Sequence, residues 1–254
     1  MAYIEYLRAR RFLRNYALAH AAFVLLAVCL LLTSLRDVVP QMWPSLTLGA
    51  LFVGASFFCS VGMTFLGASL GEARRNEDVI WTQPASRVRI ALAYFGVDVV
   101  VAVLAYSISV LTEICALRVF GVSFAAIWRP HFLLSLLLGI NVSLIFYALS
   151  QLVTVRYRGK GKLAPQLWTY SGLLTQPLLN TTGPPIVREL VGYLNVLNPL
   201  AYLGRTVVRT GYVLYGVGGP GFLDWNLQLR TLVTGLFVVC IAACAVAVWQ
   251  RSDA

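Results

Sequence analysis

Six apolar stretches dominate this sequence and decide what it can fold into. A helix needs about 20 mostly apolar residues to cross the hydrocarbon core of a bilayer. The stretches cover residues 16–35, 46–70, 90–117, 132–155, 163–179 and 232–249. Because lipid gives the backbone no hydrogen-bond partners, such stretches form helices unless they alternate as barrel strands, and no such alternation occurs. The sequence therefore predicts an all-α integral membrane protein with six transmembrane helices.

Composition and breaks in the pattern refine this prediction. The chain of 254 residues is 59% hydrophobic and 12% charged, with a mean hydropathy of +0.77, which excludes a water-soluble domain. The fifth stretch is the weakest, because Pro165 and Pro177 interrupt it and leave it short. We expect a single transmembrane domain over residues 1–254, with that helix kinked or only partly embedded.

The net charge of +10 is distributed unevenly between the connections. Thirteen of the 20 Lys and Arg residues lie before the first stretch, after the second, after the fourth and at the C-terminus. Positive charge gathers in cytoplasmic connections of membrane proteins. The pattern predicts that both termini are cytoplasmic, that the chain contacts the lipid bilayer, and that it has no nucleic-acid partner.

Residue patterns that would indicate an enzyme are missing. There is no GxxxxGK[ST] sequence, so the chain is not expected to bind ATP in that way. The two histidines form no HExxH motif, and the five cysteines show no CxxC spacing. The sequence predicts no catalytic residue, no metal site and no cofactor on this chain.

A polar stripe runs along the third stretch at three- and four-residue steps. It comprises Tyr94, Asp98, Tyr106, Ser109 and Glu113. Carboxylates at bilayer depth are costly and normally face a protein interior or a water-filled path. Two interpretations stay open: the stripe lines a translocation path, or each carboxylate anchors a helix end near Arg87 and Arg89 or near Arg118.

The neighbouring stretches carry matching polar faces. On the fourth they are Ser143, Tyr147, Ser150 and Thr154, of which we assign Tyr147 and Ser150 to the same path. On the second they are Ser56, Ser60 and Thr64, followed by Gly67 and Gly71. Such residues also hold neighbouring helices together, so a purely structural role is the alternative.

The connection over residues 71–89 mixes both signs of charge, whereas the one after the fourth stretch is purely basic. Residues 73–81 can form two helical turns that end before Pro84. Mixed charge indicates a docking surface for a protein partner. The predicted contact residues are Glu72, Arg74, Arg75, Asn76, Glu77, Asp78, Trp81, Pro84, Ser86 and Arg87.

Two further segments read as amphipathic helices at the membrane surface. Before the first stretch, Ala9, Phe12, Leu13 and Tyr16 form an apolar arc opposite arginines, which predicts an N-terminal elbow helix. The outer segment, residues 180–230, contains a predicted interfacial helix over 200–215.

In their order along the chain, these motifs resemble those of the membrane subunits of ABC-2 type transporters. In that family a basic elbow precedes six spans, and an acidic residue after the second span precedes a coupling helix and a Pro-x-Ser-Arg-like step. Glu72, residues 73–83 and Pro84-Ala85-Ser86-Arg87 fit this pattern, and Leu197-Asn198-Pro199-Leu200 is similar to the family's Asn-Pro-Leu step.

The resemblance implies a permease, expected to be an exporter, in a bacterial cytoplasmic (inner) membrane. It implies a dimer with a second permease copy or homologue, and a cytoplasmic ABC ATP-binding subunit that carries ATP and Mg. Two alternatives remain: a non-transporting membrane assembly or sensory protein that docks a cytoplasmic partner, and an intramembrane enzyme that uses Asp98 or Glu113.

Overall fold

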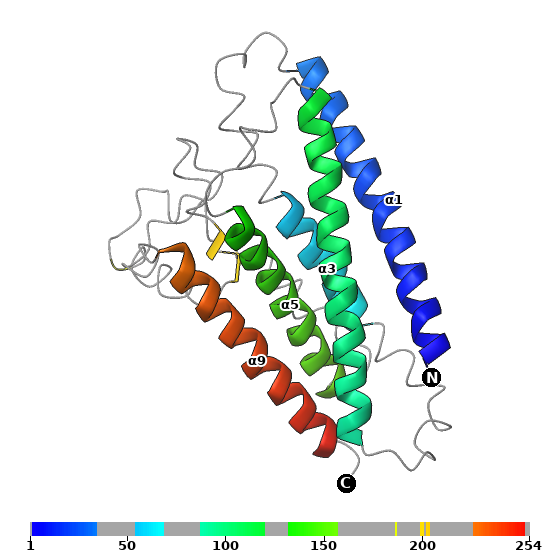
Figure 1. Cartoon of the computed structure of the whole chain (residues 1–254), viewed down its shortest axis with the longest axis vertical. Coiled ribbons are helices and arrows are strands. Elements are labelled where there is room, and N and C mark those ends of the chain that lie inside the picture. Colours follow the sequence, from blue (N-terminus) through cyan, green and yellow to red (C-terminus); the bar gives the residue numbers. More distant parts are fainter. Residues whose placement is uncertain are drawn as a thin grey trace.

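The computed structural model consists of long α-helices (Figure 1). It describes residues 2–34, 54–68, 87–119, 132–156, 186, 199–200, 202–203 and 226–251. The helices are α1 (Ala2–Ser34), α3 (Arg87–Val119), α5 (Phe132–Arg156), α9 (Leu227–Arg251) and an unlabelled one over Gly54–Ala68, called the short helix below. No strand occurs within these ranges.

Four of these helices are long and apolar enough to cross a membrane. Their apolar parts are Tyr6–Cys29, Ala91–Arg118, Phe132–Thr154 and Leu227–Val248. Large apolar side chains such as Leu18 and Leu25 of α1 and Leu232 and Val239 of α9 are exposed. In a bilayer these side chains would contact lipid, which is consistent with a multi-pass membrane protein.

The prediction of an all-helical membrane fold is therefore confirmed, but six spans are not. The predicted second span, residues 46–70, is represented by the short helix Gly54–Ala68. The predicted fifth span, residues 163–179, lies outside the described residues. So does most of the predicted outer segment, of which residues 186, 199–200, 202–203 and 226–230 are described. Pro199, Leu200, Tyr202 and Leu203 are buried, whereas Ile186 is exposed.

Contacts between helices give their directions. Arg8 meets Asp98 and Tyr16 meets Ser109, so α1 and α3 run parallel. Asp98 also meets Tyr147, while Tyr106 packs beside Gly139, so α5 runs opposite to α3. Asn141 contacts Thr231 near the start of α9, and Gln151 lines the same hollow as Ala245 near its end, so α5 and α9 run in the same direction. The N- and C-termini consequently lie at the same end of the bundle (Figure 1).

This arrangement constrains the connection from α5 to α9. The C-terminal ends of α5 and α9 lie on the same side of the bundle, and the N-terminal end of α9 lies on the opposite side (Figure 1). The chain must therefore return from one end of the bundle to the other between Arg156 and Leu227. If α5 and α9 both cross a bilayer, this return crosses it an odd number of times.

The N-terminal amphipathic pattern lies within a longer helix. Helix α1 continues without a break from Ala2 to Ser34, so a separate elbow helix is not confirmed. Phe12 and Leu13, on the apolar arc, pack against the core cluster, and Tyr16 is buried within it. The arc thus faces α3 and the short helix, while Arg10 and Arg11 are exposed.

A polar clamp joins the parallel helices α5 and α9. The Asn141 amide donates to the Thr231 carbonyl oxygen at 3.0 Å and to the Thr234 hydroxyl at 3.4 Å. Interhelical hydrogen bonds in membranes contribute about 0.6 kcal/mol on average and at most about 1.7. The clamp fixes the axial register of the two helices.

We expect Asn141→Ala to lower the free energy of unfolding by about 0.6–1.7 kcal/mol, measured in lipid or mixed micelles. The matched control is Ser107→Ala, because the exposed Ser107 hydroxyl donates to the Val103 carbonyl oxygen of its own helix. That control is expected to change stability by less than about 0.5 kcal/mol. Equal losses in the two variants would contradict a role for the clamp.

Candidate functional site

The predicted polar stripe of α3 faces the inside of the bundle along its whole length. Its steps of three and four residues put the side chains on one helix face, and that face meets the other helices. The buried polar seam, as we call it, comprises Tyr94, Asp98, Tyr106, Ser109 and Glu113 of α3 with Tyr147 and Ser150 of α5, all of them buried.

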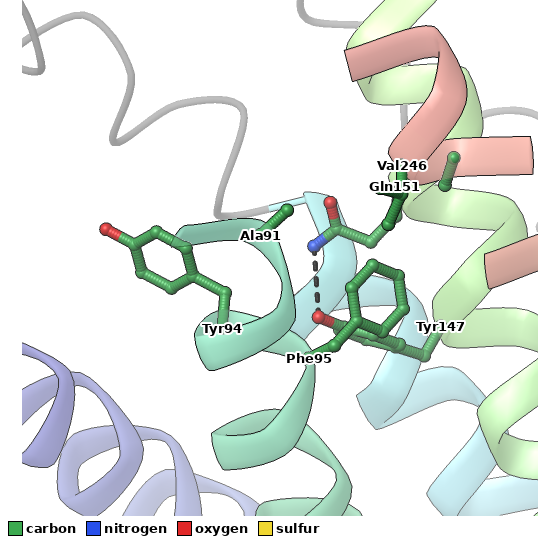
Figure 2. Close-up of a pocket in the computed structure, with 7 residues that line it drawn as sticks. Ala91, Tyr94, Phe95, Tyr147, Gln151 and Val246 are labelled. Carbon is green, nitrogen blue, oxygen red and sulfur yellow. Dashed lines mark hydrogen bonds between the residues drawn. The ribbon is translucent and has the colours of Figure 1, made fainter. Parts of the chain in front are cut away.

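At the N-terminal end of the seam, an ion pair joins three helices. The Arg8 guanidinium of α1 donates to one oxygen of the Asp98 carboxylate, and the Tyr147 hydroxyl donates to the other at 2.5 Å. Gln151 donates to the Tyr147 hydroxyl at 3.2 Å (Figure 2). Asp98 is fully buried, so the pair lies in the interior rather than at an exposed helix end.

A small hollow lies beside this cluster. It is lined by Ala91, Tyr94, Phe95, Tyr147, Gln151, Ala245 and Val246. Figure 2 shows the Tyr94 hydroxyl pointing away from the others, while the rings of Phe95 and Tyr147 lie close together. The space holds about one water molecule, far less than a small-molecule site requires. This part of the seam is therefore closed to a small molecule in the structure.

In the middle of the seam, hydroxyl groups connect α1, α3 and the short helix. Tyr16 and Ser109 share a hydrogen bond of 2.5 Å, and Ser56 and Tyr106 share one of 3.1 Å. The Ser150 hydroxyl of α5 donates to the Thr64 carbonyl oxygen at 2.8 Å. Polar contacts thus join α3 to α1 and to the short helix, and the short helix to α5.

At the far end, Glu113 lies beside His20 of α1. The distance from His20 Nε2 to Glu113 Oε1 is 3.8 Å, and the same Nε2 lies 3.3 Å from the Ser109 carbonyl oxygen. Among the described residues, the group within ion-pair distance of Glu113 is His20 and not Arg118. The sequence left open that Glu113 anchors a helix end beside Arg118. The observed neighbour of its carboxyl group is instead His20.

Two members of the network were not assigned to a site from the sequence. Arg8 and His20 carry hydrogen bonds of the seam, but they lie about 90 positions from their partners in α3. A signal did exist for His20, because it follows the buried Tyr16 by four residues on the same face of α1.

The predicted docking residues lie largely beyond the described part of the chain. Residues 71–86 fall outside it, and Arg87 is the first residue of α3. Within the described ranges, no group of three or more His, Cys, Asp or Glu side chains could hold a metal ion. The described side chains of the seam therefore offer buried hydrogen bonds and ion pairs.

No family model, curated protein or solved structure matches this chain.

Proposed function

We propose that the protein is the membrane permease subunit of an ABC-2 type transporter, working as an exporter. In this proposal a separate ATP-binding subunit hydrolyses ATP, and a second permease copy or homologue completes the membrane part. The observation that carries the proposal is the buried polar seam, which places two acidic side chains and several hydroxyl groups between apolar helices.

Such a seam is costly for a protein that only needs to stay in the membrane. A charged side chain at bilayer depth costs about 2.5–3.5 kcal/mol on insertion scales. Apolar residues would pack the helices without that cost. Polar groups shared between helices can exchange partners when the helices move, which suits a protein that alternates between two arrangements.

The directions of the helices also support the proposal. Helices α1, the short helix, α3 and α5 alternate in direction, and α9 repeats the direction of α5. One crossing between α5 and α9 gives the six spans that the resemblance implies. The connection from the short helix to α3 then starts and ends at the same end of the bundle as both termini.

The proposal predicts that this connection binds the ATP-binding subunit. Glu77→Arg combined with Asp78→Arg is expected to reduce co-purification of the ATP-binding subunit that the proposal requires by about tenfold or more. Reversing two charges in an interface costs more than the roughly 1.4 kcal/mol that corresponds to tenfold. The measurement is the amount of ATPase recovered with the tagged full-length protein.

A matched control reverses charge in another connection that is predicted to be cytoplasmic. Lys160→Glu with Lys162→Glu is expected to leave ATPase recovery and ATP hydrolysis in proteoliposomes unchanged. Unchanged recovery and hydrolysis in the Glu77/Asp78 variant would contradict the proposal. That result would favour the alternative of a non-transporting assembly or sensory protein.

A further inference from the structure

His20 and Glu113 form a buried ionisable pair between α1 and α3, away from the Arg8–Asp98 ion pair. The exposed fractions are 0% for His20 and 8% for Glu113. Within the described part of the chain, His20 Nδ1 and Glu113 Oε2 are buried without a hydrogen-bond partner. Buried polar atoms without a partner are rare and require an explanation.

The contact with Ser109 fixes the state of the imidazole. His20 Nε2 lies 3.3 Å from the Ser109 carbonyl oxygen. A carbonyl oxygen only accepts hydrogen bonds, so Nε2 must carry the hydrogen. A second proton on Nδ1 would create a buried N–H group with no acceptor in the described surroundings. The geometry therefore favours a neutral His20.

A neutral His20 leaves a Glu113 carboxylate without a counter-charge. The Nε2–Oε1 distance of 3.8 Å is too long for a hydrogen bond. On the side of the short helix, Glu113 Oε1 lies 3.0 Å from where a Cβ on Gly54 would stand, so the packing there is close. An unpaired carboxylate in such a place is strongly unfavourable.

The other groups near the pair do not change this conclusion. Among the described residues, the ionisable side chains of the adjoining core cluster are Tyr16 of α1, Cys59 of the short helix, Tyr106 of α3 and Tyr147 of α5, and none of them carries a positive charge. The Arg8–Asp98 pair lies 15 residues, or about 22 Å, away along α3. Arg118 is exposed, on the outside of the bundle.

We propose that Glu113 is a proton-binding site, at which the carboxyl group holds a proton while α1 and α3 are packed together. When the helices separate and water enters, the carboxyl O–H bond breaks, its electron pair stays on the oxygen, and the proton passes to water. The ligand is the proton itself. Since the packed state holds one more proton, raising the pH favours separation of α1 from α3.

Infrared spectra of the full-length protein in lipid nanodiscs test whether Glu113 carries the proton. At neutral pH, the C=O band of a carboxylic acid is expected in the wild type and lost in Glu113→Gln. The control Arg8→Met with Asp98→Asn removes both members of the other buried ion pair and is expected to keep this band. Loss of a carboxylate band in Glu113→Gln, without loss of an acid band, would overturn the proposal.

A second measurement does not depend on the folding of a Glu113 variant. His20 and His131 are the two histidines of the chain, so His131→Gln leaves only the His20 imidazole in a nitrogen NMR spectrum. A neutral ring with its hydrogen on Nε2 supports the proposal. A doubly protonated ring at neutral pH would show an ion pair with Glu113 and overturn it.

The link to helix movement has its own test. Cys29 of α1 and Cys115 of α3 are exposed, and Cys240→Ser with Cys244→Ser removes the other exposed thiols. Spin labels on Cys29 and Cys115 are expected to show a growing population of long distances as the pH rises. Adding Glu113→Gln should abolish this pH dependence, and an unchanged dependence would contradict the proposed site.

Discussion

Asp98→Asn is expected to lower the free energy of unfolding by about 3–5 kcal/mol, the loss usual for breaking a buried ion pair from one side. Asp98 is fully buried and accepts hydrogen bonds from both Arg8 and Tyr147. Removing its charge leaves the guanidinium of Arg8, which is 16% exposed, without the carboxylate. The measurement is reversible unfolding in mixed micelles or bilayers.

Two further variants separate the ion pair from a general loss of packing. Arg8→Met combined with Asp98→Asn removes both charges and is expected to recover stability to within about 1 kcal/mol of the wild type. Arg11→Gln removes an exposed charge from the same helix and should change stability by less than about 0.5 kcal/mol. If the double variant lost as much stability as the two single variants together, the two charges would not be coupled, which would contradict this account.

Gly139→Ala is expected to destabilise the protein by about 1–3 kcal/mol, the usual cost of overpacking. A Cβ at this position would overlap the Tyr106 hydroxyl and lie 2.7 Å from the Ser56 hydroxyl. These two hydroxyl groups bond to each other at 3.1 Å, so displacing one also breaks that contact. Thermal or denaturant unfolding of the purified protein measures the loss.

Gly96 offers a matched control within an apolar helix. A Cβ added there meets nothing within 4 Å, and alanine favours a helix by up to about 1 kcal/mol over glycine. Gly96→Ala should therefore be neutral or stabilising. Tyr106→Phe in the Gly139→Ala background should recover part of the loss, because it removes the overlapping oxygen. Similar losses at Gly139 and Gly96 would contradict this account of close packing.

The polar stripe of α3 shows what the sequence could reveal about the site. The steps from Asp98 to Glu113 share one helix face at a period of 3.6 residues, and this face is buried. The same reasoning applies to Tyr147 and Ser150 of α5. Local periodicity predicts such faces well because it depends only on the geometry of one helix.

The partners across the helices could not be predicted in this way. Arg8 belongs to a segment rich in arginine, and its sequence context does not distinguish it from the exposed Arg10 and Arg11. Its contact with Asp98 depends on how α1 packs against α3, which is a property of the tertiary fold. The same applies to His20 and Glu113.

The separate elbow helix predicted before Tyr16 is not confirmed. These residues are helical, but they belong to one unbroken helix α1 that begins at Ala2. The arginine-bearing residues before Tyr16 stay helical because their apolar side packs on neighbouring helices. An interfacial elbow and an inward-packing helix have the same amphipathic pattern, so the sequence alone does not separate them.

The most direct test of the account is the side of the membrane on which three positions lie. In a variant without native cysteines, Ala2→Cys, Asn226→Cys and Gln250→Cys would each be treated with a membrane-impermeant thiol reagent. We predict that Asn226→Cys reacts in intact cells, and that Ala2→Cys and Gln250→Cys react only after permeabilisation. Reaction of Asn226→Cys and Gln250→Cys from the same side, or of Ala2→Cys and Gln250→Cys from opposite sides, would contradict the account.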